Sequence, residues 1–296
     1  MTPSQHIYRD KMITVAGMLD RPNGENMQDT CGKDWPSIVL GTGGLHGETC
    51  DYVVSQAVTV GYRWFDTAFS YGNEADLAAA LRRSGLPRSE YSIITKLPGR
   101  SHGYIQTKDR IQSQLTEMGL DYVDLYLIHW PNPRIGLFGE SWHAMCEAQQ
   151  QGLIRRIGVS NFDSRLINQL PEDLPGPAVV QTEIHPWWPQ EEFIQWLKER
   201  YIQPMAWSPL RKGQGGILES KVVSEVASKI GCSTAAAIIM WHRSRGVIPV
   251  VKSKQSTHLK ENFLAATTPN QEFPISISSD KIRLRRGGDP WEHEEF

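Results

Sequence analysis

Four residues suited to proton transfer lie near the ends of three consecutive strand-like stretches. Asp66 ends the apolar, β-favouring stretch Tyr62 to Asp66, and Tyr71 follows in the next loop. Lys96 and His129 end the two stretches that come next. In proteins that alternate parallel strands and helices, side chains at the C-terminal ends of the strands face the ligand site. We therefore expect a carboxylate, a phenol, an ammonium and an imidazole to meet there.

The phenol of Tyr71 is the expected proton donor, although an ordinary tyrosine pKa of about 10 suits neutral pH poorly. Lowering it by about two units requires about 3 kcal/mol in favour of the phenolate. An ammonium about 4 Å away supplies about 1 kcal/mol in water but about 4 kcal/mol at an effective dielectric of about 20. Lys96 must therefore be partly buried, with Asp66 keeping it charged and in place. His129 is expected as a neutral donor that orients a carbonyl oxygen beside Tyr71.

Each residue alone has an ordinary structural explanation, and only their placement at three consecutive strand ends favours a catalytic set. A metal site is the alternative. Glu183 and His185 lie two apart on one strand face and, with His129 or Asp66, would suit Zn²⁺ or Mn²⁺ in a hydrolase. Because the sequence contains no H-x-H or H-E-x-x-H motif and Lys96 would intrude on the ligands, we expect no metal.

Eight strand-like segments recur along the chain, with helical patterns between them. The helical patterns place apolar residues three and four positions apart, which indicates one buried face. Such alternation predicts the α/β class and a single-domain (β/α)₈ TIM barrel. A doubly wound sheet is the alternative, but Gly41-Thr42-Gly43-Gly44 does not fit G-x-G-x-x-G. The expected strands are Ile38 to Gly41, Tyr62 to Asp66, Tyr91 to Lys96, Val123 to His129, Ile157 to Ser160, Val179 to Ile184, Pro204 to Ser208 and Val247 to Val251; the helical patterns lie within 53–58, 77–81, 111–118, 142–148, 166–170, 193–197 and 222–230.

The composition of the 296-residue chain, with 40% hydrophobic and 22% charged residues, is typical of a soluble globular protein. No apolar run reaches the roughly 18 residues of a membrane span, and the start shows no secretory pattern. We expect an N-terminal arm or hairpin at 1–35, because of the turn signal Pro22-Asn23-Gly24, the barrel at 36–270 and a divergent tail at 271–296.

Charge and cysteines favour a cytoplasmic protein without a nucleic-acid partner. The net charge is −2, and the basic cluster before residue 287 is followed by Glu292, Glu294 and Glu295, so we expect a solvated tail. The four cysteines, Cys31, Cys50, Cys146 and Cys232, form no C-x-x-C pair and indicate a reducing compartment. We expect a monomer or weak oligomer.

Taken in order, several motifs resemble those of the aldo-keto reductases. The resemblance runs from about Ile38 to Phe263 and is carried by Gly61-Tyr62-Arg63-x-x-Asp66-Thr67-Ala68-x-x-Tyr71-Gly72-Asn73-Glu74, Ile94-Thr95-Lys96, Asp121 to Pro131, Ile157-Gly158-Val159-Ser160-Asn161-Phe162, Gln181-x-Glu183-x-His185-Pro186, Trp207-Ser208-Pro209-Leu210, Lys252-Ser253 and Glu261-Asn262.

The resemblance implies hydride transfer from NADP(H), with NAD(H) as the alternative, to the carbonyl of a small molecule. It also implies a tetrad of Asp66, Tyr71, Lys96 and His129, with Tyr71 giving the proton. In the implied cofactor site, Ser160, Asn161 and Gln181 hold the carboxamide, Trp207 stacks on the nicotinamide, Ser208 and Leu210 line the pyrophosphate, Lys252 and Ser253 meet the 2′-phosphate, Glu261 and Asn262 meet the adenine, and Gly41, Thr42, Asp66 and His258 complete the set.

Several positions depart from the family pattern. His258 stands where arginine is usual, and a lost charge-assisted contact of about 1.5 to 3 kcal/mol would reduce the preference for NADPH by about ten- to a hundredfold. Gly43 replaces a larger pocket residue, and the tail after Phe273 is unlike the usual specificity loop. The expected substrate pocket is apolar and aromatic, with Leu45, Phe69, Trp130, Trp187 and Trp188 as its candidates.

Reduction of an aldehyde or ketone is thus the predicted activity. Two alternatives use the same residues: a cofactor-bound regulatory barrel with little turnover, and a biosynthetic dehydratase or isomerase.

Overall fold

A computed structural model gives the structure of the chain and describes residues 34–269, 285 and 287–296. The chain divides after Trp35, and the larger unit is Pro36–Phe296. The expected N-terminal arm or hairpin therefore lies outside the described residues, apart from Asp34 and Trp35, and so does most of the tail before residue 287. The strands and helices of the described residues all belong to the larger unit.

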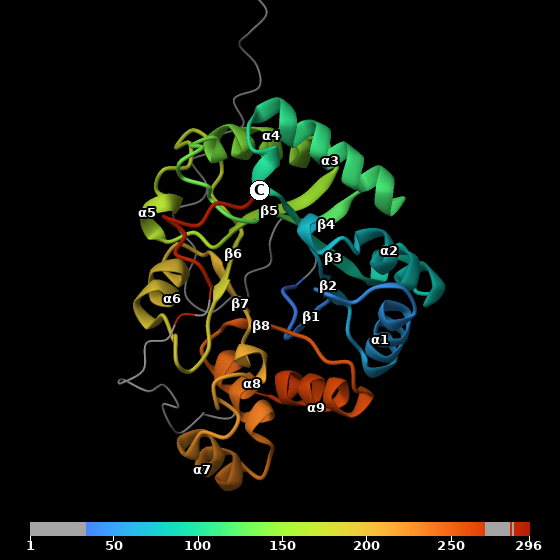
Figure 1. The fold of residues 1–296 in the computed structure, drawn as a ribbon, viewed down its shortest axis with the longest axis vertical. Coiled ribbons are helices and arrows are strands. Elements are labelled where there is room, and N and C mark those ends of the chain that lie inside the picture. Colours follow the sequence, from blue (N-terminus) through green and yellow to red (C-terminus); the bar gives the residue numbers. More distant parts are fainter. Residues whose placement is uncertain (1–33, 270–284, 286) are drawn as a thin grey trace, which may run out of the picture. The chain divides into compact units, whose positions relative to one another are not determined.

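Eight parallel strands close into a barrel in chain order, with helices around it (Figure 1). The predicted (β/α)₈ fold is confirmed, and the closed strand order contradicts the doubly wound alternative. The strands are β1 Val39–Gly41, β2 Trp64–Asp66, β3 Ser92–Leu97, β4 Val123–Ile128, β5 Ile154–Ser160, β6 Val179–Glu183, β7 Gln203–Trp207 and β8 Ile248–Val251, and β8 pairs with β1.

The register of the strands brings the first two candidate residues together. Asp66 of β2 pairs with Ile94 of β3, and Gly41 of β1 pairs with Asp66 from the other side. Since side chains alternate along a strand, Lys96 lies on the same face of β3 as Ile94, one pleat nearer the C-terminal end. Asp66 and Lys96 are therefore neighbours at that end of the barrel.

The helices lie between the strands, and the seven helical patterns of the sequence correspond to α1 to α7. They are α1 Gly47–Val60, α2 Glu74–Arg83, α3 Tyr104–Met118, α4 Phe138–Gln150, α5 Ser164–Ile167, α6 Glu191–Lys198, α7 Lys221–Ile230, α8 Thr234–Ser244 and α9 Ser256–Thr267, with 3₁₀ turns η2 Phe69–Tyr71, η3 Arg88–Glu90, η4 Gly99–Ser101 and η5 Arg211–Gly213. Gly231 caps α7 with φ 71°, as expected of a glycine after a helix.

A buried polar network behind Lys96 ties α2 and α3 to β3 and β4. Glu74 accepts hydrogen bonds from Thr95 (2.5 Å) and from the amide of Gln114 (2.7 Å), and Gln114 accepts one from Tyr126 (2.5 Å). Burial raises the pKa of the Glu74 carboxyl, although both hydrogen bonds act to lower it. The network fixes the backbone of β3 beside Lys96.

The fifth strand differs most from its predicted bounds, since it begins at Ile154 and not at Ile157. Arg155 and Arg156 interrupt the apolar pattern there. Arg156 is nonetheless buried, with its guanidinium 5.6 Å from the centre of the Trp64 ring, and burial lowers its pKa to about 10.

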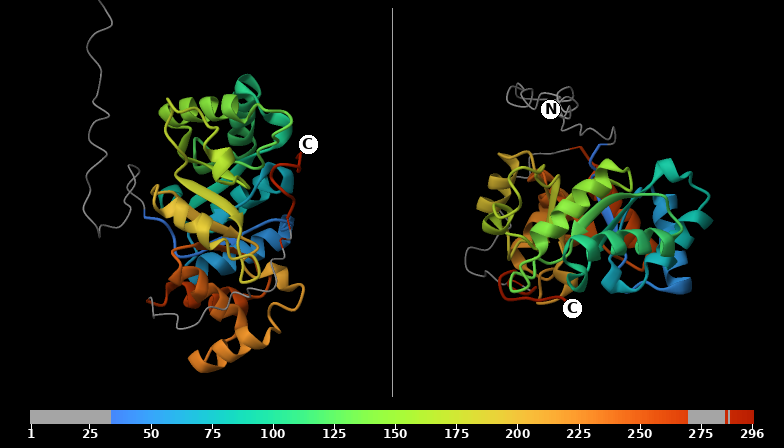
Figure 2. Two further views of the ribbon diagram at one scale, coloured as in Figure 1. Left: turned by 90° about the vertical axis from the view of Figure 1, so that its left-hand side faces the viewer. Right: turned by 90° about the horizontal axis from the view of Figure 1, so that it is seen from above.

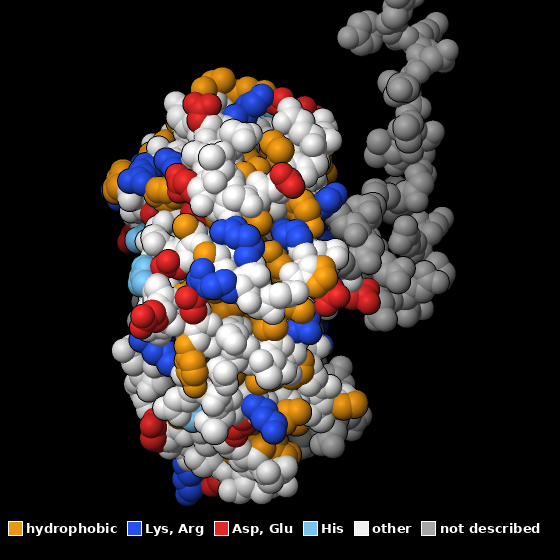
Figure 3. Space-filling model, turned by 90° about the vertical axis from the view of Figure 1, so that its right-hand side faces the viewer, with side chains coloured by type: hydrophobic (Ala, Val, Ile, Leu, Met, Phe, Trp, Pro, Cys, Tyr) orange, Lys and Arg blue, Asp and Glu red, His pale blue; other side chains and the backbone are white. Residues whose placement is uncertain are grey.

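Within the described ranges, no single helix is long and apolar enough to cross a membrane, whereas α7 and α8, bent by 84°, pass that test as a pair by length and composition. Basic and acidic side chains are interspersed on the face that Figure 3 shows. Cys50, Cys146 and Cys232 are free thiols, and Cys31 lies outside the described residues.

Candidate active site

A buried ion pair lies at the centre of the site. Nζ of Lys96 donates hydrogen bonds to both carboxylate oxygens of Asp66, at 2.9 and 2.8 Å, and to the carbonyl oxygen of Thr67 at 2.8 Å. The Lys96 side chain is 1% exposed. Burial is the largest single influence and acts to lower its pKa, but the charges of Asp66 and Tyr71 and the hydrogen bonds to both together outweigh burial, so the pKa is raised. Lys96 thus stays an ammonium, as expected of a lysine held by a carboxylate.

Tyr71 lies beside this ion pair, on the short turn η2 that replaces the loop expected after β2. The ammonium of Lys96 is 5.2 Å from the centre of the phenol ring. Burial raises the pKa of Tyr71, the charge of Lys96 acts to lower it, and Asp66 acts to raise it. The net pKa is above its ordinary value, so the expected net lowering by Lys96 is wrong: burial of the phenol and the Asp66 charge outweigh the ammonium.

His129 follows β4 and completes the four-residue set. Its ring centre is 6.0 Å from that of Tyr71, with the rings nearly perpendicular at 82°. Nδ1 lies 2.7 Å from Oε1 of Glu295 and 3.4 Å from the hydroxyl of Ser70. The structure therefore brings Asp66, Tyr71, Lys96 and His129 together, as the sequence predicted.

The residues expected at a nicotinamide ring lie next to these four. The amide nitrogen of Gln181 donates to Asp66 at 2.7 Å. The side chain of Asn161 donates to the carbonyl oxygen of His129 at 2.9 Å and accepts from the indole nitrogen of Trp207 at 2.8 Å. Asn161 adopts a left-handed backbone with φ 62° that places it in this bridge. The group that meets here comprises Ser160 at the end of β5, Asn161 directly after it, Gln181 within β6 and Trp207 at the end of β7.

The residues expected at the other end of a dinucleotide are more open. Lys252 follows β8, is exposed, and donates to the carbonyl oxygen of Gly43 at 2.7 Å. Burial of its ammonium, then the charges of Lys212 and Lys254, lower the pKa of Lys252. Three cations within range of one another suit a phosphate group. The other candidates are Ser208, Leu210, Ser253 and Glu261, which are half-buried, Gly41 and Thr42 beside Asp66, Asn262, which is buried, and His258, which is exposed; their roles remain predictions.

Comparison with known proteins places this arrangement in a family. A family model described as "Aldo/keto reductase family" matches residues 37–275 of the chain. The chain belongs to the aldo-keto reductase family. It is an oxidoreductase that reduces carbonyl groups of small molecules with a nicotinamide cofactor. These matches give no support to a regulatory barrel or to a dehydratase or isomerase.

Proteins with similar sequences are named after different substrates. The chain is 36% identical over 284 residues to 2,5-diketo-D-gluconic acid reductase B of Corynebacterium sp., covering 93% of this chain and 100% of the relative. It is 35% identical over 246 residues to methylglyoxal reductase DkgA of Escherichia coli O157:H7, with coverages of 83% and 88%. The solved structure of an aldo-keto reductase of Bombyx mori in complex with NADP is 30% identical to this chain, with a TM-score of 0.74. The match covers 82% of this chain and 88% of the Bombyx mori chain.

The expected pocket residues of this aldo-keto reductase have varied surroundings. Leu45 has no exposed surface and lies in the main core, so a substrate would contact it only if it moved. Trp187 is 9% exposed and belongs to the smaller core under α6, α7 and α8. Trp130 is half-buried, with its ring centre 4.0 Å from that of His293. Phe69 lies 4.7 and 4.2 Å from the guanidinium carbons of Arg100 and Arg110, and Trp188 lies 5.9 Å from that of Arg285.

Glu183 and His185, the core of the alternative metal site, are fully buried and paired with each other. Nε2 of His185 lies 3.0 Å from Oε1 of Glu183, and the other carboxylate oxygen accepts from the backbone N–H of Gly287 at 2.6 Å. Within the parts of the chain that the structure covers, no three His, Cys, Asp or Glu side chains are grouped to hold a metal ion.

The tail supplies the residue that the sequence analysis missed. Glu295 was expected in a solvated tail, but its carboxylate lies at His129 and its side chain is 12% exposed. Glu294 is also half-buried, and only Glu292 of the acidic run is exposed. The solvated-tail expectation is therefore wrong for Glu294 and Glu295. Charge counting missed them because it cannot tell a solvated carboxylate from one that a distant histidine binds.

Proposed function

We propose that this chain reduces a small aldehyde or ketone to an alcohol with NADPH, and that Tyr71 is the general acid. The observation that carries the proposal is the buried Lys96–Asp66 ion pair beside Tyr71, with the His129 ring also next to the phenol. General acids act best when a neighbouring charge stabilises their conjugate base, and the Lys96 ammonium does so for a Tyr71 phenolate.

When bound, the reduced nicotinamide supplies hydride to the carbonyl carbon. The chain's own residues handle the oxygen. His129 orients the carbonyl oxygen towards the Tyr71 hydroxyl, which donates its proton as negative charge develops on that oxygen. The raised pKa of Tyr71 keeps the phenol protonated at neutral pH, which a proton donor requires. Lys96 then stabilises the phenolate until a proton returns from solvent.

The donors present fit a nicotinamide dinucleotide with a 2′-phosphate. Amides and a hydroxyl at the ends of β5 and β6 suit a carboxamide, and the half-buried indole of Trp207 suits a flat ring. The mutual influence of Lys252, Lys212 and Lys254 supports a phosphate site at the other end and therefore NADP(H) over NAD(H). We further propose a cytoplasmic location, on the grounds of the free thiols of Cys50, Cys146 and Cys232, and a monomer or weak oligomer.

The Tyr71→Phe variant tests the proposal. It keeps the ring and removes the proton donor, so we expect kcat for an aldehyde with NADPH to fall by at least about a hundredfold. NADPH binding, measured by fluorescence titration, should change by less than about threefold. Tyr52→Phe is the matched control, because Tyr52 is 53% exposed on α1. Full turnover in the Tyr71→Phe variant would refute the assigned acid.

A further inference from the structure

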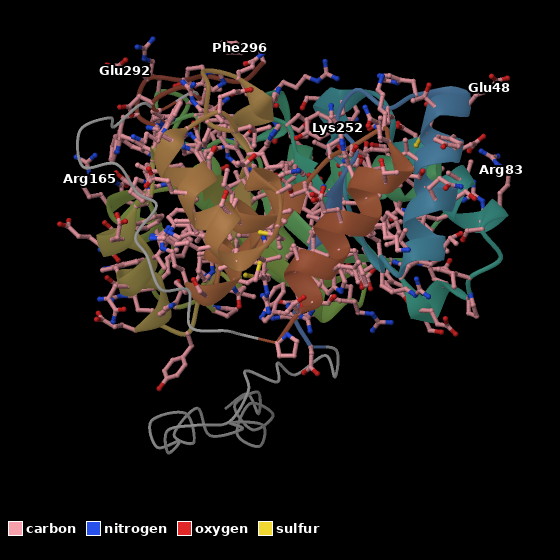
Figure 4. All side chains as sticks on the ribbon, turned by 90° about the horizontal axis from the view of Figure 1, so that it is seen from below. Glu48, Arg83, Arg165, Lys252, Glu292 and Phe296 are labelled. Atoms are coloured by element: carbon pink, nitrogen blue, oxygen red, sulfur yellow. The ribbon has the colours of Figure 1, made fainter. Side chains whose placement is uncertain are left out.

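The described tail, residues 287–296, crosses the end of the barrel at which the strands finish. In Figures 1 and 2 the red C-terminal trace runs along that end, and Figure 4 shows Glu292 and Phe296 on the same side of the barrel as Lys252. The tail contacts segments that follow successive strands. Gly287 bonds to Glu183 of β6, Trp291 to Asp163 after β5, and Glu294 to the backbone of Arg134 after β4.

Two barrel loops hold Glu295 in place through Gly99 and Asn132, and we call this contact site the seat of Glu295. Its backbone N–H donates to the Asn132 side chain at 3.1 Å, and its carbonyl oxygen accepts from the same side chain at 2.7 Å. Asn132 is fully buried and has a left-handed backbone, with φ 44°. Gly99 gives its backbone N–H to the Glu295 carboxylate at 3.1 Å, and a Cβ at Gly99 would lie 2.1 Å from the Glu295 carbonyl oxygen. These close contacts indicate that Glu295 is a fixed part of the wall of the candidate active site.

The carboxylate in this seat is an anion that faces the reacting end of the pocket. Burial alone would raise the pKa of Glu295, but the hydrogen bond and charge of His129, with the bond from Gly99, outweigh burial and lower it. In the described part of the chain its one ion-pair partner is His129, at 2.7 Å, and no lysine or arginine neutralises it.

Glu295 also decides which nitrogen of His129 is left for a substrate. A carboxylate is a hydrogen-bond acceptor, so Nδ1 carries the proton that it accepts. Nε2 is then the nitrogen that a substrate meets, with the negative charge of Glu295 on the far side of the same ring. A second anion next to the reacting carbonyl would be repelled across the imidazole.

We propose that Glu295 is a specificity-determining residue that makes the site favour uncharged carbonyl compounds over those with a carboxylate next to the reacting carbonyl. The proposal rests on the proposed function, because it concerns the substrate of the same site. Two charges about 7 Å apart, at an effective dielectric of about 20 to 40, repel enough to change a rate by about ten- to fiftyfold.

Two aldehydes test the proposal: methylglyoxal, which is uncharged, and glyoxylate, in which a carboxylate replaces the acetyl group. The measured quantity is the ratio of their kcat/KM values with NADPH, taken at the same pH for wild type and for every variant. In Glu295→Gln, which keeps the shape and removes the charge, we expect the ratio to shift about ten- to fiftyfold towards glyoxylate. Glu295→Lys should shift it further, and Glu294→Gln, which removes a neighbouring charge, should shift it less than threefold.

The outcomes separate the two proposals. If wild type reduces methylglyoxal but neither Glu295 variant changes the ratio by more than threefold, the charge-selection role is refuted and the proposed function stands. An equal shift in Glu294→Gln would also refute it, because a diffuse tail charge would then be responsible. If wild type with NADPH reduces neither these aldehydes nor a wider carbonyl panel, the proposed function fails and the inference fails with it.

Discussion

Nδ1 of His129 lies 2.7 Å from Oε1 of Glu295, a residue 166 positions further along the chain. The hydrogen bond connects the tail to His129, whose carbonyl oxygen accepts from the side chain of Asn161. The backbone N–H of Asn161 donates to Gln181, and the Gln181 amide donates to Asp66, so the tail belongs to the same network as the Lys96–Asp66 pair. A substitution at the Gly99 and Asn132 contacts of Glu295 therefore tests how firmly the tail is held.

Gly99→Ala is expected to displace the tail. The added Cβ would meet the Glu295 carbonyl oxygen at 2.1 Å and the Asn132 side-chain nitrogen at 2.2 Å, distances that no Cβ adopts. We expect hydrogen exchange of residues 287–296, followed by mass spectrometry, to accelerate at least about tenfold. Gly176→Ala is the control, because a Cβ there has no atom within 4 Å. Equal exchange in the two variants would contradict the proposed seat.

Lys96→Met is expected to impair both the reaction and the fold. It leaves the Asp66 carboxylate buried without its cation, which costs about 3 to 5 kcal/mol of stability. It also removes the charge that stabilises a Tyr71 phenolate, so kcat should fall by about a hundredfold or more. Urea unfolding and steady-state kinetics measure the two effects.

The double variant Asp66→Asn, Lys96→Met distinguishes the two losses. Because it leaves no unpaired buried charge, it should recover about half or more of the lost stability and none of the activity. Recovery of turnover in the double variant would mean that Lys96 acts only on the fold.

The pH dependence of the reaction follows from the raised pKa of Tyr71. Reduction needs the protonated phenol, so its rate should stay level through neutral pH with respect to Tyr71 and fall only above pH about 10. Oxidation of the alcohol needs the phenolate, so its rate should rise with pH over the same range. Profiles of kcat against pH in both directions check this. If the reduction rate already falls as pH rises towards about 9, and Tyr71→Phe abolishes that fall, the pKa of Tyr71 during the reaction is low and the prediction is contradicted.

Glu74 should make stability depend on pH. Its folded pKa is raised above the unfolded value by burial, so the folded state binds more protons and stability falls as pH rises from about 4.5 upward. Glu74→Gln removes this titration while keeping an oxygen for Thr95 and Gln114. The stability of the variant relative to wild type should therefore be greater at pH 8 than at pH 5, as measured by urea unfolding. The exposed Glu48→Gln variant should show no such difference.

Lys252 is expected to select the cofactor. A charge-assisted contact to a phosphate is worth about 1.5 to 3 kcal/mol, so Lys252→Met should raise the Kd for NADPH by about ten- to a hundredfold and change that for NADH by less than threefold. Fluorescence titration measures both constants. Lys229→Met, at an exposed position of α7, is the control. An equal loss for both cofactors would place Lys252 away from the 2′-phosphate.

The strands were predictable because they are short apolar, β-favouring segments, buried at nearly every position. Seven helices were predictable because their apolar residues recur three and four positions apart. Helices α8 and α9 were both missed. The middle of α8, Ala235 to Trp241, is apolar on nearly every side and gives no periodic contrast. The start of β5 was missed for the opposite reason, since Arg156 is a cation inside the barrel wall. At α8 and at the start of β5, tertiary packing and not local pattern decides burial.

The four-residue set was predictable because barrel topology brings consecutive strand ends together. Two of its properties were not. The sign of the Tyr71 pKa shift depends on how deeply the phenol is buried, which spacing along the chain does not encode. Glu295 reaches His129 from outside the repeating units, so no strand-end rule points to it.

The separate origin of Glu295 has a structural consequence. The residues proposed for proton transfer lie on hydrogen-bonded strands and their adjoining turns, where substitutions disturb the barrel, whereas the carboxylate proposed to choose the substrate belongs to a short segment laid over the loops. Residues 287–296 take no part in the pairing of the eight barrel strands. The substrate preference is thus carried by a segment that contributes no strand to the barrel.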